Sequence, residues 1–150
     1  MAKKFNFKLE PILKLRNYKT NTAKESLSQA LTARYAKETE INQVMNQKNN
    51  WLDKPTKSAK VWEMQAKQNH LNLLDIQNAK LEKEKQQIVE IENVRRAVLA
   101  NAMKDEKIIE KLKEKQKERH WQETEMEERN FLDEISIRRY IATEKEISLD

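Results

Sequence analysis

Hydrophobic residues recur along the first third of this chain at alternating steps of three and four. This spacing is typical of a helical face that packs against another helix. Several positions of the seam are polar, so the helix would not be stable alone, and the pattern predicts a helix over about 9–52 that pairs with a second one. The seam positions are Leu9, Leu13, Arg16, Thr20, Ala23, Leu27, Ala30, Arg34, Lys37, Ile41, Val44, Lys48 and Trp51.

A second helical pattern extends from about residue 60 to about residue 141. Residues 61–141 contain no Gly or Pro and are rich in Lys, Glu, Gln and Arg, which favour helices. The seam spacing slips near 81–90 and again past Leu112, which predicts a bend or local unwinding. Its seam candidates are Val61, Met64, Leu71, Leu74, Leu81, Ile88, Ile91, Arg95, Val98, Ala102, Ile109, Leu112, Gln116, Met126 and Ile137.

Local signals mark the start of the first helix. Phe5, Phe7 and Leu9 alternate with polar residues, as in an extended segment. Pro11 suits the first turn of a helix, where its missing N–H costs nothing, and Glu10 suits the positive helix end.

The connection between the two helices is predicted at about 53–59. Pro55 pushes the residue before it away from helical geometry. Asp53, Thr56 and Ser58 are candidates to cap the second helix.

The composition supports an all-α fold. The chain has 0 Gly and 2 Pro among 150 residues, and its charged and hydrophobic residues each make up 37%. Disorder is the alternative, because high charge also marks chains that cannot bury enough surface to fold. The regular apolar spacing favours a single elongated domain, residues 1–150, folded as a long antiparallel two-helix coiled coil. A second form of this fold, a helical hairpin rod with a bend or a short helix in its middle, stays open.

The two predicted helices differ in length, and this leaves two arrangements open. Folding back from Pro55 would place the start of the first helix beside residues near 95–105. Everything after Leu112 would then overhang as a bare helix, or the second helix would break and return. Trp51 and Trp62 suit packing at the turn, whereas Trp121 and Phe131 in the overhang are candidates for a binding role.

The residue chemistry argues against an enzyme and against a resident cofactor or metal. There are no cysteines, and without Gly there is no phosphate-binding loop. His120 with Glu123 and Glu127 is a poor metal site, so solvated surface is the better interpretation. No apolar run reaches the length of a membrane span and no secretory signal opens the chain, so a cytoplasmic protein is expected.

Charge is uneven along the chain and leaves a nucleic-acid or membrane-surface role as an alternative. Residues 1–60 contain 13 Lys and Arg against 5 Asp and Glu, whereas residues 61–150 contain 17 against 20. The basic residues of the first helix are dispersed and lack aromatic neighbours for stacking on bases, which disfavours nucleic acid. A generic coiled-coil adaptor, stably dimeric, is the other alternative.

The N-terminal motif Phe5-x-Phe7-x-Leu9-Glu10-Pro11-Ile12-Leu13-x-Leu15-Arg16 resembles the FliJ family of flagellar type III export stalk proteins. Leu132-Asp133-Glu134, followed by Ser136, Arg138 and Arg139, resembles a late signature of the same family. The resemblance implies an antiparallel coiled coil whose two termini lie together. For the termini to meet, a bend or short helix between 53 and about 90 would have to take up the extra length.

The resemblance also implies partners and a location. The stalk end enters the hexameric flagellar export ATPase, other surfaces contact the cytoplasmic domain of the export gate membrane protein and export chaperones, and the protein acts as a monomer at the inner face of the membrane. Carried over by motif, the ATPase-binding residues would be Phe5, Phe7, Leu9, Leu13, Arg16, Leu132, Asp133, Glu134 and Arg138. By position alone, the gate-binding candidates are Ile41, Val44, Met45, Leu71 and Leu74, for which ordinary seam packing is the competing interpretation.

Overall fold

The structure, a computed structural model, describes residues 3–55 and 60–149. They form two helices, α1 (Glu10–Leu52) and α2 (Val61–Ser148), and the described ranges contain no strand, which confirms the predicted all-α class. Packing divides the chain into two units. The terminal unit comprises Met1–Asn17 and Lys104–Asp150, and the hairpin unit comprises Tyr18–Met103.

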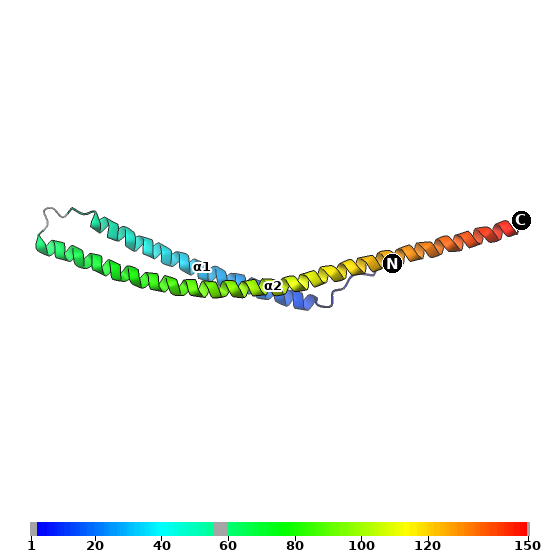
Figure 1. The fold of residues 1–150 in the computed structure, drawn as a ribbon, viewed down its shortest axis with the longest axis horizontal. Coiled ribbons are helices and arrows are strands. Elements are labelled where there is room, and N and C mark those ends of the chain that lie inside the picture. The colour runs from blue at the N-terminus through cyan, green and yellow to red at the C-terminus, as the bar shows by residue number, and fades with distance from the viewer. Residues whose placement is uncertain (1–2, 56–59, 150) are drawn as a thin grey trace. The chain divides into compact units, whose positions relative to one another are not determined.

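In the hairpin unit, α1 and α2 run side by side in opposite directions, as Figure 1 shows for the cyan and green segments. Lys48 of α1 pairs with Asp75 of α2, and Lys37 pairs with Glu84 at 2.8 Å between Nζ and Oε2. Farther along, the Arg95 guanidinium donates to the Ser26 carbonyl oxygen at 2.7 Å. Residue numbers rise on one helix as they fall on the other, so the predicted antiparallel helical hairpin is confirmed.

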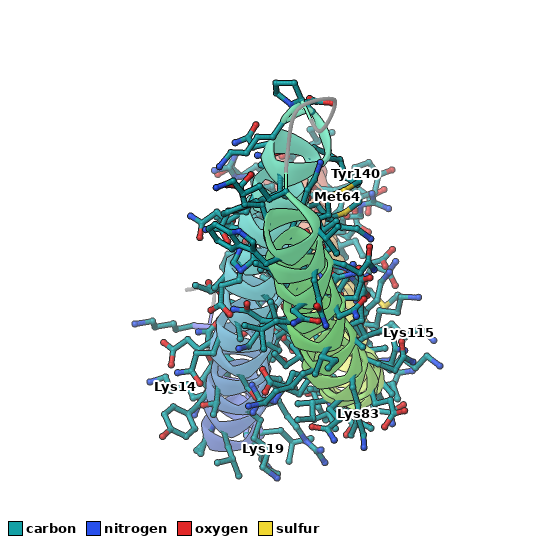
Figure 2. The ribbon with its side chains drawn as sticks, turned by 90° about the vertical axis from the view of Figure 1, so that its left-hand side faces the viewer. Lys14, Lys19, Met64, Lys83, Lys115 and Tyr140 are labelled. Atoms are coloured by element: carbon teal, nitrogen blue, oxygen red, sulfur yellow. The ribbon has the colours of Figure 1, made fainter. Side chains whose placement is uncertain are left out.

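The core of the hairpin unit is a small apolar cluster near the turn. Ile41 and Val44 of α1 pack with Leu74 and Leu81 of α2, and Trp51 covers one end. Burial of each such side chain contributes about 1.5–3 kcal/mol. Figure 2 shows polar side chains projecting all around the helices, so little apolar surface beyond the seam supports the pairing.

The seam on α1 follows the predicted positions closely. All thirteen, from Leu9 to Trp51, are buried or half-buried. The polar residues among the thirteen are also buried or half-buried, because the position of a residue around the helix, and not its hydrophobicity alone, decides whether it faces α2. Thr20, for example, is 3% exposed.

The seam on α2 differs from the prediction. Ile91 and Val98, predicted as seam positions, are 48% and 54% exposed, and their places are taken by the buried Glu92 and the half-buried Leu99. With Glu92 in the seam, the spacing does not slip after Leu81. Accordingly, α2 is one helix across 81–90, where the sequence suggested a break.

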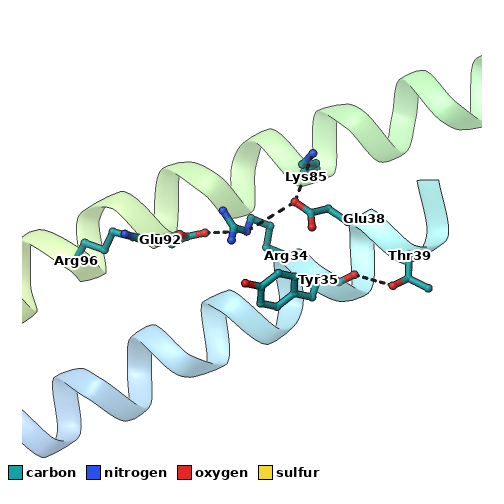
Figure 3. Close-up of polar contacts among 7 residues, drawn as sticks. All are labelled: Arg34, Tyr35, Glu38, Thr39, Lys85, Glu92 and Arg96. Carbon is teal, nitrogen blue, oxygen red and sulfur yellow. Dashed lines mark hydrogen bonds and ion pairs between the residues drawn. The ribbon is translucent and has the colours of Figure 1, made fainter. Parts of the chain in front are cut away.

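Glu92 is buried because cationic side chains surround it (Figure 3). It is 2% exposed, and the Arg34 Nε lies 3.3 Å from its Oε2. Arg96, one turn along α2, donates from Nε and Nη2 to Oε1 at 3.1 and 2.6 Å. The Arg34 Nε and the Glu92 Oε2 are not aligned for a hydrogen bond, so their contact is an ion pair held by electrostatic attraction. Lys85 and Glu38, 3.6 Å apart, extend this polar layer.

Local sequence signals are seen at both helix starts. The Lys60 backbone N–H donates to the Glu63 carboxylate at 3.3 Å, which satisfies one of the free donors at the start of α2. Glu10 lies in the first turn of α1, as predicted. Thr56 and Ser58, two of the predicted caps, lie outside the described residues. No helix in the described ranges has an apolar stretch that could span a bilayer.

Replacing Arg34 by Met is expected to lower the free energy of unfolding by about 3 kcal/mol, because the buried Glu92 loses a charge partner. The double substitution Arg34→Met with Glu92→Leu should recover most of that loss, because an apolar pair needs no charge compensation. Urea unfolding followed by circular dichroism measures both. A double variant less stable than Arg34→Met alone would show that the ion pair is not what makes Glu92 tolerable.

The Lys37–Glu84 pair predicts a pH dependence. The hydrogen bond from Lys37 lowers the pKa of Glu84 below its ordinary 4.5, and the hydrogen bonds to Glu84 and then Glu40 raise the pKa of Lys37 above its ordinary 10.5. The lowered pKa stabilises the fold above pH 4.5 and stops doing so as pH falls through the folded value. Glu84→Gln should therefore lower Tm at neutral pH and have little effect in strong acid. An equal change in Tm at both pH values would contradict this origin.

Candidate partner-binding site

In the terminal unit, an extended N-terminal segment lies along α2. We call residues 3–9 the lead-in. Phe7 is 5% exposed and its ring centroid lies 5.9 Å from the Lys113 Nζ, a cation–π contact. The same Lys113 pairs with Glu10 at 2.9 Å. The predicted extended segment is confirmed, and Phe7 is its buried anchor.

The far end of the lead-in reaches His120. The Phe5 ring lies 5.6 Å from the imidazole, centroid to centroid, and the Lys3 carbonyl oxygen lies 2.7 Å from His120 Nε2. His120 thus serves as a docking residue for the lead-in. The described residues contain no group of His, Cys, Asp and Glu that could hold a metal ion.

The next predicted contact residues also face inward. Leu13 is 7% exposed, and Leu9 is half-buried. Arg16 Nη1 bonds Asp105 Oδ2 at 2.9 Å. The N-terminal motif therefore packs α1 and the lead-in onto α2, and its buried members cannot touch a partner directly unless that packing opens.

The late motif lies elsewhere on α2. Leu132 is 61% exposed, Asp133 is exposed, and Glu134 pairs with Arg138 on the same helix at 2.6 Å. Phe7 contacts α2 at Lys113, twenty residues before Asp133 and thus about 30 Å away along the helix. The expectation that the first dozen and the last twenty residues lie side by side is wrong. Because α2 is one unbroken helix, no bend takes up the greater length of α2, and its C-terminal end extends past the N-terminal segment.

Beyond the lead-in, no other described segment of the terminal unit lies beside α2, as the orange and red part of the helix in Figure 1 shows. We call residues 125–148 the free segment. This is the bare overhang that the helix lengths alone suggested. Its large apolar side chains are unusually exposed: Met126, Phe131, Leu132, Ile137, Tyr140, Ile141 and Ile147 are between 47% and 71% exposed.

Comparison with known proteins identifies the family. The family model of the flagellar FliJ protein matches residues 5–145, nearly the whole chain. The chain belongs to the FliJ family. No curated protein and no solved structure gives a significant match. Membership of the FliJ family assigns the chain a role in flagellar export.

Four of the five gate-binding candidates are buried in this FliJ-family chain. Ile41, Val44, Leu71 and Leu74 are between 3% and 7% exposed and form the seam of the hairpin unit, as the competing interpretation of seam packing expects. Met45, the fifth, is 49% exposed. The positional argument selected apolar residues, and the seam needs the same residues.

Sequence reasoning passed over several exposed residues of the free segment. Ile137 and Met126 were assigned to the seam, whereas they are 60% and 64% exposed. Tyr140 and Ile141 were not singled out at all. Two adjacent apolar residues on a helix, such as Tyr140 and Ile141, indicate that at least one of them is exposed, because a single seam cannot bury both.

Phe7→Ala is expected to release the lead-in from α2, because the buried ring is its main apolar contact. The His120 imidazole would then lose the ring-current effect of Phe5, and its NMR resonances should move toward those of an exposed histidine. Tyr140→Ala, which removes an aromatic ring that is 66% exposed, is the matched control and should leave them unchanged. Unchanged His120 resonances in Phe7→Ala would mean that Phe7 does not anchor the lead-in.

Proposed function

We propose that this chain is the stalk of a flagellar export ATPase and that the free segment of α2 is the part that enters the ATPase ring. The observation that carries the proposal is the exposure of Phe131 and Leu132, at 63% and 61%, on a part of α2 that packs on no other described segment of the terminal unit. Large apolar and aromatic side chains are typical anchors of protein interfaces. Asp133, Glu134 and Arg138 would supply polar contacts beside them.

The N-terminal motif has a supporting role in this proposal. Leu13, Arg16 and the lead-in brace α2 where it begins to run alone, between residues 105 and 120. Phe5, Phe7 and Leu9 would therefore affect the ATPase by holding the base of the free segment.

The mechanism follows from the asymmetry of a single helix inside a hexameric ring. One helix has different side chains on each side, so it cannot contact six identical subunits in the same way. The subunits that it touches differ in free energy from the rest, and a difference of about 1.4 kcal/mol already changes an equilibrium tenfold. Such a bias can order nucleotide binding and hydrolysis around the ring without any catalytic group on the stalk.

The remaining partners are assigned by family resemblance and accessibility. Contact with the cytoplasmic domain of the export gate would use exposed side chains of the hairpin unit, among which Met45 is the surviving candidate. Export chaperones would be further partners, and the working location would be the inner face of the cell membrane. A monomer suits insertion in a ring, because a stable dimer would cover the surface that the ring needs.

Phe131→Ser with Leu132→Ser is expected to reduce stimulation of the export ATPase about tenfold, while circular dichroism shows unchanged helix content. Leu73→Ser with Ile76→Ser is the matched control, because these residues are 59% and 69% exposed on α2 of the hairpin unit. Phosphate release by the purified ATPase, with and without each variant, is the measurement. Full stimulation by the first variant, or equal loss in both, would refute the assignment to the free segment.

A further inference from the structure

One side of α2 in the terminal unit combines basic and aliphatic residues without any acidic one. We call Lys104, Ile108, Lys111, Leu112, Lys115 and Arg119 the basic strip. Steps of three and four place these residues on one side of the helix. Ile108 is 63% exposed and Leu112 is 36% exposed, and Lys115, labelled in Figure 2, extends away from the helix.

The strip lies on the side of α2 that faces away from α1. The half-buried Ile109 and Lys113, which pairs with Glu10 of α1 at 2.9 Å, mark the side of α2 that packs on α1. Ile108, Lys111 and Lys115 lie on the other side of the helix. A partner can therefore reach the strip without displacing α1.

The basic residues of the strip have no intramolecular use in the structure. None of the four takes part in an ion pair among the described residues, although Lys113 and Arg16 nearby both do. Lys111, Lys115 and Arg119 follow one another at steps of four, a like-charge spacing that destabilises a helix by about 0.2–0.5 kcal/mol per pair. The acidic residues of this stretch, such as Glu106 and Glu110, lie on other sides of the helix. Ion pairing among the described residues therefore does not account for this row of basic side chains.

We propose that the basic strip is a docking surface for an acidic amphipathic helix of another protein. Ile108 and Leu112 would receive the apolar face of that helix. Lys104, Lys111, Lys115 and Arg119 would pair with carboxylates on its flanks, and charge complementarity of this kind sets partner choice in coiled coils. The docked helix would pack on α2 from the side opposite α1. The surface is separate from the free segment, and it does not depend on the ATPase assignment.

The acidic stretch of this chain does not match the strip. Residues 121–134 contain six Asp and Glu, but Glu123, Glu125 and Glu128 point to different sides of the helix. No apolar face flanked by carboxylates results, so a second copy is not the occupant. An anionic membrane fits less well than a helix, because the strip has no aromatic residue to sit at a membrane interface.

The test uses the full chain and a designed helical peptide of about three heptads, with Leu at positions a and d and Glu at the flanking positions. Fluorescence anisotropy of the labelled peptide should show saturable binding that weakens with salt. Lys111→Glu with Lys115→Glu should weaken binding at least about tenfold, because attraction becomes repulsion. Ile108→Ser should also weaken it, and Lys111→Gln with Lys115→Gln serves if the Glu variant proves less helical by circular dichroism.

Two controls make the test specific. Lys14→Glu with Lys24→Glu changes the net charge equally at exposed lysines outside the strip and should leave peptide binding within about twofold. A peptide with Lys in place of Glu should not bind. Equal binding of the acidic peptide by all variants, or no binding at all, would overturn the proposal.

The other occupants give distinct results that would equally overturn it. Sedimentation of the chain alone tests a second copy: dimerisation lost in Lys111→Glu with Lys115→Glu would assign the strip to self-association. Co-sedimentation with phosphatidylglycerol vesicles tests a membrane: vesicle binding that depends on the strip, without peptide binding, would assign it to lipid. Stimulation of the export ATPase should be unaffected by the strip variants, which separates this proposal from the function of the free segment.

Discussion

Everything in this chain depends on one seam in which two weak helices bury each other. Neither helix has a continuous apolar face, and helices of such composition gain most of their stability in proteins from packing. The apolar cluster around Leu74 supplies the strongest pairing near the turn, and Phe7 and Leu13 supply it in the terminal unit. Elsewhere the seam relies on small residues and ion pairs. The outer surface of the two helices therefore contributes little to their pairing and is available to bind partners.

The sequence predicted the seam on α1 completely and the seam on α2 only in part, for a physical reason. On α1 the periodic positions were followed through polar residues such as Thr20 and Arg34, so the helical geometry was respected. On α2, Ile91 and Val98 were assigned to the seam because they are apolar, although steps of three and four from Leu81 lead to Glu92 and Leu99. The preference for a buried glutamate arises from Arg34 on the other helix, and a partner so distant in sequence leaves no local signal.

The placement of the candidate site was also only partly predictable. Motifs singled out the lead-in and the region around Leu132, but whether the two lie together depends on whether α2 bends. An unbroken α2 leaves the free segment unpaired, and the lead-in packs near its base at His120. The residues of the N-terminal motif that were predicted to contact a partner thus pack on α2, and exposed side chains such as Tyr140 are better candidates for partner contact. The length of α2, which composition alone does not fix, determines which residues stay exposed.

The buried carboxylate has a consequence for alignment. A heptad repeat looks nearly the same after a slip of seven residues, and an apolar seam alone would tolerate such a shift. A slip in one direction would carry Glu92 toward Ile41, and a slip in the other would carry it toward Leu27, in both cases away from Arg34. A slipped Glu92 would keep Arg96, which lies on the same helix, but would lose the charge of Arg34. The loss of one partner of a buried charge is costly, so the carboxylate favours the observed alignment. The length of helix left over for a partner is then set by one acidic residue in the middle of the chain.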